Sequence, residues 1–228
     1  MGFDDLHKKR QGKLKARKEN IKKVEPLRYL IVCEGEKTEP GYFEVLKRKL
    51  NEKYRPELIK LKVNCVDVHG TGKNTESLIE YTLKMKNNAS IGYGNIWCVF
   101  DKDSFTKEQF NNAILKAEKE GIKTAWSNEA IELWFVLYFE YLTAGIDRKQ
   151  YISKLNFYFK KYNINKGKYE KNLSNIYEIL EEKGNYESAV ACAKRLEKNY
   201  SDYQTHADRK PMTTVYKLVE ELKEMLKN

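Results

Sequence analysis

The chain has few cysteines and histidines, and their arrangement excludes several classes of protein. Among its 228 residues there are 4 cysteines and 3 histidines, with no CxxC pair and no cysteine–histidine cluster at zinc-ligand spacing. HExxH and GxSxG motifs are also absent, so neither a zinc protease nor a serine hydrolase is expected. We expect the cysteines to be reduced, buried thiols that pack as small apolar side chains.

Long hydrophobic runs are absent as well. No run approaches the roughly 18 apolar residues that a membrane-spanning helix needs, and residues 1–25 lack the apolar core of a signal peptide. The chain begins Met1-Gly2, but Leu6 stands where a myristoylation signal requires serine or threonine. We therefore expect a cytoplasmic protein with no membrane contact.

Positive charge is in excess. Lysine and arginine number 43 against 33 aspartates and glutamates, a formal net charge of +10. Residues 1–25 are especially basic, and we expect them to form a flexible arm. A basic excess favours polyanions such as nucleic acid through counterion release, although a lysine-rich protein without such a partner would have the same composition.

Apolar runs alternate with amphipathic stretches through residues 26–145. The predicted strands and helices, in chain order, are strand 28–33, helix 41–53, strand 58–68, helix 75–87, strand 95–100, helix 106–120, strand 122–126 and helix 129–142. This alternation predicts an α/β domain with a Rossmann-like parallel sheet of about four strands flanked by helices. Residues 146–228 have mostly helical spacing and predict a helical extension packed on that core, ending in an amphipathic helix at 212–227.

Carboxylates follow three of the four predicted strands, where the crevice of an open α/β sheet lies. Asp101 and Asp103 follow the third strand, and in an extended segment residues i and i+2 point to the same side. Such a pair suits Mg²⁺ or Mn²⁺, although two aspartates in a solvated turn could instead cap the next helix. Glu34 follows the first strand and precedes Gly35, so it could act as a general acid/base or as a further metal ligand.

The loop at residues 69–75 (HGTGKNT) does not match a nucleotide-binding motif. A Walker A sequence requires glycine where this chain has Asp67, and serine or threonine where it has Asn74. We therefore do not expect an ATP site.

Basic and glycine residues near these strand ends are candidates for binding a substrate phosphate. Gly70, Gly72 and Lys73 lie in a loop that enters a helix N-terminus, a place that favours anions. Lys37, in the loop after the first strand, could neutralise a phosphate. An ordinary turn and an exposed lysine are the alternatives.

Polar residues also follow the fourth strand. Ser127 and Asn128 could cap the predicted helix that begins at residue 129, and at this strand end they are also candidates for binding the substrate. Glu129 and Glu132 share one face of that helix, where glutamate is favourable for the helix dipole alone. Further along, residues 151–172 interleave Tyr and Phe with Lys, which suits either a single-stranded nucleic-acid surface or helix packing.

Four separated blocks of the sequence resemble the RloB-like family over roughly residues 28–222. The blocks are LIVCEGEKTEPGYFE (30–44), WCVFDKDSF (97–105), AWSNEAIELWFVLYFE (125–140) and KPMTTVYKLVEEL (210–222). The resemblance implies a TOPRIM-like fold, the α/β module shared by topoisomerases, primases and OLD-type nucleases. It assigns general acid/base catalysis to Glu34 and metal binding to Asp101 and Asp103.

The same resemblance bears on the residues after the fourth strand. The family's Ser-Asn-x-x-x-Glu block corresponds to Ser127, Asn128 and Glu132, which makes Glu132 a candidate metal ligand. Where the family often has proline and an aromatic residue, this chain has Glu129 and Ile131. That departure weakens the inference for this block.

We therefore expect a Mg²⁺- or Mn²⁺-dependent nuclease that hydrolyses phosphodiester bonds. The resemblance implies a role in phage defence or abortive infection, association with restriction–modification genes and a partner ATPase from the same locus. The alternatives are a non-catalytic nucleic-acid-binding or regulatory subunit and an enzyme acting on small nucleotides. The sequence leaves open whether the substrate is DNA, tRNA or another RNA, how many metal ions bind, and whether the chain forms a homodimer.

Overall fold

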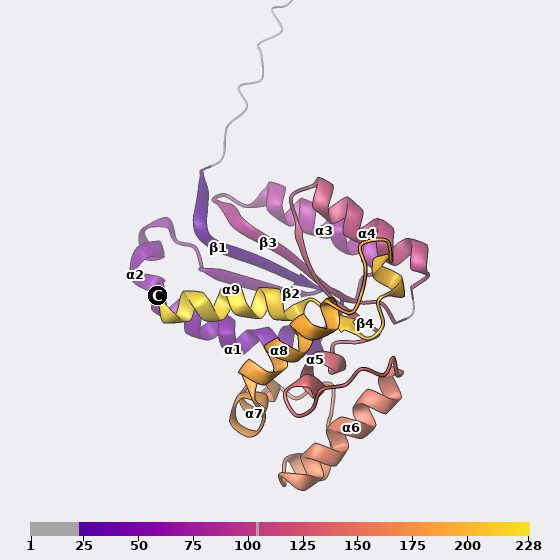
Figure 1. The fold of residues 1–228 in the computed structure, drawn as a ribbon. Helices are drawn as coiled ribbons and strands as arrows, with labels where there is room; N and C mark the ends of the chain where they lie inside the picture. Colours follow the sequence, from indigo (N-terminus) through magenta and orange to yellow (C-terminus); the bar gives the residue numbers. More distant parts are fainter. Residues whose placement is uncertain (1–22, 104) are drawn as a thin grey trace, which may run out of the picture.

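The computed structural model describes residues 23–103 and 105–228 (Figure 1). Its elements, in chain order, are β1 (Val24–Cys33), α1 (Thr38–Lys53), α2 (Arg55–Leu58), the 3₁₀ turn η3 (Ile59–Leu61), β2 (Val66–Gly70), α3 (Thr75–Asn88), β3 (Gly92–Asp101), α4 (Lys107–Lys119), β4 (Lys123–Asn128), α5 (Glu132–Leu137), α6 (Arg148–Lys161), η4 (Asn165–Gly167), α7 (Ile176–Lys183), α8 (Tyr186–Glu197), η5 (His206–Asp208), β5 (Met212–Thr213) and α9 (Val215–Lys227). No helix among these is long and apolar enough to cross a membrane.

The sheet has five strands in the order β2-β1-β3-β4-β5. The first four pair in parallel, and the short β5 pairs antiparallel with β4. At the carboxyl end of β1, Cys33 stands in register with Gly70 of β2 and with Val99 of β3. The predicted α/β class, a mostly parallel Rossmann-like sheet flanked by helices, is confirmed. The additional strand comes from residues 212–213, which were expected to be helical.

Helices cover both faces of the sheet, so β1 is apolar on both sides. Leu30 and Val32 belong to the hydrophobic cluster under α3 and α4, while Ile31 and Cys33 belong to the larger cluster under α1 and α9. Figure 1 shows α3 and α4 along one face of the sheet and α1 with α9 along the other.

The C-terminal helices share the larger hydrophobic cluster with the sheet. Leu155 of α6, Leu180 of α7 and Leu218 of α9 are fully buried in it together with Ile31 of β1. In Figure 1, α6 lies at the end of the molecule furthest from α3. The division of the chain at residues 145 and 146 stays a prediction.

The predicted strand at 58–68 is wrong in its first part, because residues 55–61 form α2 and η3. Pro56 stands in the first turn of α2, where its fixed φ is favourable. Leu58 is buried and Ile59 is exposed, but both residues lie in helical turns and not in a strand. The strand begins only at Val66.

The predicted helix at 129–142 is reduced to α5, Glu132–Leu137. The strand before it is longer than expected, since β4 continues to Asn128 and pairs with both β3 and β5. At the other end, the carbonyl of Tyr138 accepts a hydrogen bond of 2.9 Å from the backbone N–H of Asn185. The Tyr138 carbonyl is therefore bonded to a distant segment instead of to a next helical turn, and α5 ends at Leu137.

The expected basic arm lies largely outside the described residues. Within the described part, Val24 and Glu25 already belong to β1, so the strand begins inside the segment assigned to the arm. The cysteine prediction holds for Cys33, Cys65 and Cys98, which are buried free thiols, whereas Cys192 is only partly buried.

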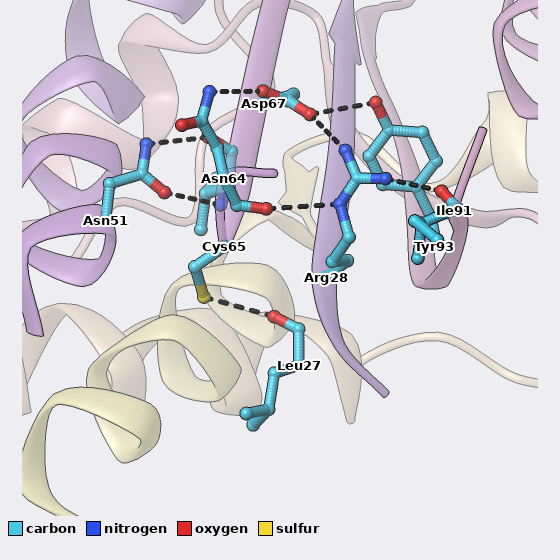
Figure 2. A network of polar contacts seen from close by, with 9 residues as sticks. Leu27, Arg28, Asn51, Asn64, Cys65, Asp67, Ile91 and Tyr93 are labelled. Carbon is cyan, nitrogen blue, oxygen red and sulfur yellow. Dashed lines mark hydrogen bonds and ion pairs between the residues drawn. The ribbon is translucent and has the colours of Figure 1, made fainter. Parts of the chain in front are cut away.

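A buried arginine in the middle of β1 bonds to residues at the amino ends of β2 and β3 (Figure 2). Arg28 is 5% exposed. It donates to Asp67 Oδ2 at 2.8 Å, to the carbonyl of Asn64 at 3.1 Å and to the carbonyl of Ile91. Its guanidinium also lies 4.0 Å from the centroid of the Tyr93 ring, whose hydroxyl donates to the same Asp67 oxygen. Arg28 thus links β1 to the starts of β2 and β3, at the end of the sheet opposite to Cys33.

Candidate active site

The carboxyl ends of β1 and β3 bring the first two predicted site residues together. Glu34 follows Cys33 directly, and its N–H donates to the carbonyl of Val99 at 2.8 Å. In return, the backbone N–H of Asp101 donates to Glu34 Oε2 at 3.2 Å. Adjacent parallel strands therefore hold the Glu34 carboxylate beside Asp101.

The segment after β3 is held against the segment after β4. The backbone N–H of Lys102 donates to the carbonyl of Ser127 at 2.9 Å, and that of Asp103 donates to the carbonyl of Glu129 at 3.0 Å. This extended pairing continues the sheet past Asp101, so Asp101 and Asp103 both reach the same arginine.

That arginine is Arg148, the first residue of α6. Its Nη2 lies 2.5 Å from Asp101 Oδ2, its Nη1 pairs with Asp103 Oδ2, and its Nε lies 3.4 Å from Glu132 Oε2. One guanidinium thus contacts three carboxylates, two from the end of β3 and the segment directly after it and one from the start of α5.

A further carboxylate, Glu39, comes from the first turn of α1. It is 6% exposed, and its approach depends on Gly35: a Cβ at that position would lie 2.1 Å from Glu39 Oε2. Any side chain at residue 35 would therefore push Glu39 away. Glu132, which faces Arg148 through Oε2, accepts a hydrogen bond of 3.4 Å at Oε1 from the hydroxyl of Tyr169.

Burial raises the pKa of the Glu34 carboxyl from its ordinary value of 4.5 to about 7. The hydrogen bond from the Asp101 N–H and the charge of Arg148 oppose this rise. The negative charges of Glu39 and Asp103 add to it. A carboxyl that titrates near neutral pH can both accept and donate a proton under physiological conditions.

The pKa values of two neighbouring carboxyls, Asp101 and Glu39, shift in the same direction. Burial raises the pKa of Asp101, and Glu39 raises it further, against the opposing charge of Arg148. Burial also raises the pKa of Glu39, with Glu132 adding to the shift. For Arg148, burial acts to lower the pKa, but the attraction of Asp101 and Glu132 outweighs it, so the guanidinium stays charged.

We call the carboxylates of Glu34, Glu39, Asp101, Asp103 and Glu132 the carboxylate cluster. A cleft of about 710 Å³ opens over it. It is lined by six acidic residues (Glu34, Glu36, Glu39, Asp101, Asp103 and Glu132), four basic residues (Lys37, Lys73, Arg148 and Lys171), and Gly35, Thr38, Gly72, Asn74, Phe105 and Ile131. The acidic excess means that a phosphate would be repelled unless a further positive charge entered with it.

Seven of the predicted site residues line this cleft. They are Glu34, Asp101, Asp103, Glu132, Lys37, Lys73 and Gly72. Gly72 has a positive φ of 62°, and Asn74 caps α3 by accepting from the N–H of Ser77 at 3.0 Å. The loop therefore leads the chain past the cleft into the N-terminus of α3.

Three predicted substrate-binding residues lie elsewhere. Gly70 ends β2 and packs closely against the loop after β1. A Cβ at this position would lie only 2.8 Å from the carbonyl oxygen of Gly35, so any other residue would clash there. Ser127 and Asn128 are buried within β4: the Ser127 hydroxyl hydrogen-bonds to Thr213 Oγ1 at 2.9 Å, and the Asn128 amide donates to the carbonyl of Ala207. These side chains hold β5 and η5 against β4 and are not exposed to a substrate, and they do not cap α5.

The site also contains residues that the sequence did not single out for a role. Glu39 lies in the first turn of α1, and Glu36, three residues earlier, is equally acidic, so no local pattern distinguishes the two. Arg148 and Lys171 come from the helical extension, and no local motif marks them. Only the tertiary fold brings them to the strand ends.

The basic and aromatic stretch that begins with α6 is divided between packing and surface. Tyr151 and Phe159 are fully buried, whereas Phe157 is 63% exposed. Tyr158 stacks on Phe139 with ring centroids 4.6 Å apart. Most of these aromatic side chains therefore serve the packing of the helix.

The donor set suits a hard divalent cation in its chemistry. All candidate ligands are carboxylates, which Mg²⁺ and Mn²⁺ prefer, and the buried Oε2 of Glu132 finds no hydrogen-bond donor among the described residues. Within the same residues, no three carboxylate, imidazole or thiol groups have the arrangement of a metal site. The positive charge among these carboxylates is the Arg148 guanidinium.

The raised pKa of Glu34 predicts a pH-dependent stability cost. With a pKa of about 7 folded and 4.5 as the ordinary value, the unfolded chain gives up this proton first as the pH rises. Folding is therefore penalised increasingly from pH 4.5 to 7 and fully above that, by at most about 3 kcal/mol.

We expect Glu34→Gln to raise the free energy of unfolding by about 1–3 kcal/mol at pH 8, with the gain vanishing near pH 4.5. Urea denaturation followed by circular dichroism, with EDTA present, measures this. A difference between the two proteins that does not change with pH would contradict it.

A family model described as RloB-like protein matches residues 29–222. Comparisons with curated proteins and with solved structures gave no match. Because the family model covers well over half of the 228 residues, the chain belongs to the RloB-like protein family.

Proposed function

We propose that this protein is a metal-dependent nuclease that hydrolyses phosphodiester bonds in DNA or RNA. The observation that carries the proposal is the convergence of Glu34, Asp101 and Asp103 with two further carboxylates, Glu39 and Glu132, in one cleft at the carboxyl edge of the sheet. Such a concentration of like charge costs stability, and carboxyl groups with raised pKa values, here Glu34, Asp101 and Glu39, cluster at functional sites.

Each part of the cleft has a role in this proposal. Asp101 and Asp103, with Glu132, would hold Mg²⁺ or Mn²⁺, and Glu34 would transfer a proton or complete the ligand set. The cation would activate water and stabilise charge on the scissile phosphate. Lys37 and Lys73, on the rim, would neutralise neighbouring phosphates of the polynucleotide.

Membership of the RloB-like family adds a biological setting to the proposal. We infer a role in phage defence or abortive infection beside restriction–modification genes, in the cytoplasm, with nucleic acid as substrate. A partner ATPase from the same locus would restrain or trigger cleavage. These elements rest on the family resemblance and are separate from the chemistry of the cleft.

One observation favours a second function, that of a non-catalytic nucleic-acid-binding or regulatory subunit. Arg148 already neutralises Asp101 and Asp103 by direct ion pairs. A protein that kept the fold but used these carboxylates for structure would show the same contacts. It would bind nucleic acid equally well with and without Mg²⁺.

The deciding experiment incubates the purified protein with total RNA and with plasmid DNA in Mg²⁺, Mn²⁺ or EDTA. We expect cleavage of one pool that requires the metal, and the degraded pool identifies the substrate class. If no cleavage occurs, the assay is repeated with the neighbouring ATPase. Metal-independent binding without cleavage in both assays would support the regulatory subunit, and turnover of mononucleotides or dinucleotides alone would indicate an enzyme of small nucleotides.

A further inference from the structure

The backbone of Arg148 is fixed at the start of α6, and its guanidinium reaches into the carboxylate cluster. Asp147 caps α6 by accepting from the N–H of Gln150 at 2.9 Å, and the Gln150 side chain accepts from the Asp147 N–H. One turn further, Tyr151 and Leu155 are fully buried in the hydrophobic core. The helix start therefore cannot shift without loss of packing, whereas the guanidinium at the end of a flexible side chain can.

The pairing of Arg148 is distinctive within the cleft. Of the four basic side chains that line it in the described part of the chain, Arg148 alone forms ion pairs with the carboxylates. Its side chain is 26% exposed, against 7% for Asp101 and 1% for Glu132. The guanidinium thus covers the mouth of the cluster.

One carboxylate oxygen shows that this pairing is incomplete. Glu132 Oε2 is buried and has no hydrogen-bond donor among the described residues, and the Arg148 Nε that faces it at 3.4 Å also lacks a hydrogen-bond partner there. A buried carboxylate oxygen without a donor is costly. A cation that could contact this oxygen directly would relieve the cost.

We propose that Arg148 occupies the cation position of the cluster and that a divalent metal ion binds only by displacing it. This deepens the proposed function, since it concerns the regulation of the same site. The two cations compete because both need the facing oxygens of Asp101 and Asp103, and a dication close to a guanidinium would be repelled. Metal affinity in this protein is therefore set by the free energy of breaking the Arg148 ion pairs.

The test is the affinity of the protein for Mn²⁺, measured by the loss of the electron paramagnetic resonance signal of free Mn²⁺. We expect Arg148→Ala to lower the Kd for Mn²⁺ at least about fivefold relative to wild type, in the range of typical coupling between sites. Arg148→Lys, which keeps the charge but loses the planar pairing, should lie between the two.

Lys171→Ala is the matched control, because it removes one positive charge from the same cleft without breaking an ion pair to the cluster. We expect its effect on the Kd to stay well below that of Arg148→Ala. Adding Asp101→Asn to Arg148→Ala should weaken the gained affinity, which locates the ion in the cluster.

Unchanged or weaker Mn²⁺ binding in Arg148→Ala and Arg148→Lys, with both variants folded by circular dichroism, would overturn the proposal. So would an equal gain in Lys171→Ala, since that would reduce the effect to net charge. Tighter Mn²⁺ binding without nucleic-acid cleavage, both by the protein alone and with the partner ATPase, would leave this proposal standing and refute the nuclease, so the two failures are distinguishable.

Discussion

Asp101→Asn is expected to lower metal-dependent cleavage of nucleic acid by about three orders of magnitude, since a catalytic metal supplies several kcal/mol of transition-state stabilisation. Asparagine preserves the shape of the side chain but removes the charge. It also leaves the backbone N–H of Asp101 free to donate to Glu34, so the arrangement of the strand ends survives. The loss would thus report the missing charge and not a collapsed site.

Glu34→Gln should reduce the same activity by about 10²–10⁴-fold if Glu34 transfers a proton in the rate-limiting step. The two variants differ in what they do to metal binding. We expect Asp101→Asn to weaken Mn²⁺ affinity strongly, whereas Glu34→Gln should do so only if Glu34 is itself a ligand. Comparing the two therefore separates the roles that the sequence left open for Glu34.

The measurement is the initial rate of cleavage of the substrate pool identified with wild-type protein, at saturating Mg²⁺. Asp202→Asn is the control, because this aspartate is exposed and lies outside the cleft; it should cleave at the wild-type rate. Full activity in folded Asp101→Asn would exclude the proposed role of this residue.

The neighbourhood of Glu34 and Asp101 could be predicted from the sequence because local patterns determine it. Each residue directly follows a continuous apolar run, such runs form strands buried on both faces, and parallel strands end at one edge of the sheet. Pairing of β1 with β3 then places the two side chains together. That strand order comes from the structure, since β2 lies between β1 and β3 in the sequence.

Other parts of the site depend on contacts between distant segments. Arg148 reaches the cluster only because α6 packs beside α5, and Ser127 is buried only because Thr213, 86 residues later, pairs with it. Residue type alone favours Ser127 and Asn128 as helix caps, but it cannot reveal the fifth strand. The alternation at 58–68 predicts a strand along its whole length for a similar reason. Periodicity does not reveal the helical turns that begin beside Pro56.

Arg28→Ala is expected to lower the free energy of unfolding by about 3–5 kcal/mol, the cost typical of removing one partner from a buried ion pair. The substitution would leave the Asp67 carboxylate without its cation and would deprive the carbonyls of Asn64 and Ile91 of their donor. Tyr93 and Asn64 would still donate to Asp67, which limits but does not cancel the loss.

Urea denaturation at pH 7 measures this effect, with Arg48→Ala as the matched control. Arg48 is also an arginine in an ion pair, with Glu178 at 3.5 Å, but its side chain is 69% exposed. Exposed pairs contribute about 0–1 kcal/mol, so the control should unfold close to wild type. Similar small losses in both variants would show that the buried network contributes little.

Arg28→Lys and Asp67→Asn complete the design. Lysine keeps the charge but cannot reach the Asp67 carboxylate and two separate carbonyls in the same planar geometry, so we expect it to recover only part of the loss. Asp67→Asn should cost less in the Arg28→Ala background than in wild type, because the two residues interact directly. Since this network lies at the opposite end of the sheet from the cleft, the folded fraction of each variant should keep the Mn²⁺ affinity of wild type, which separates stability from the chemistry of the site.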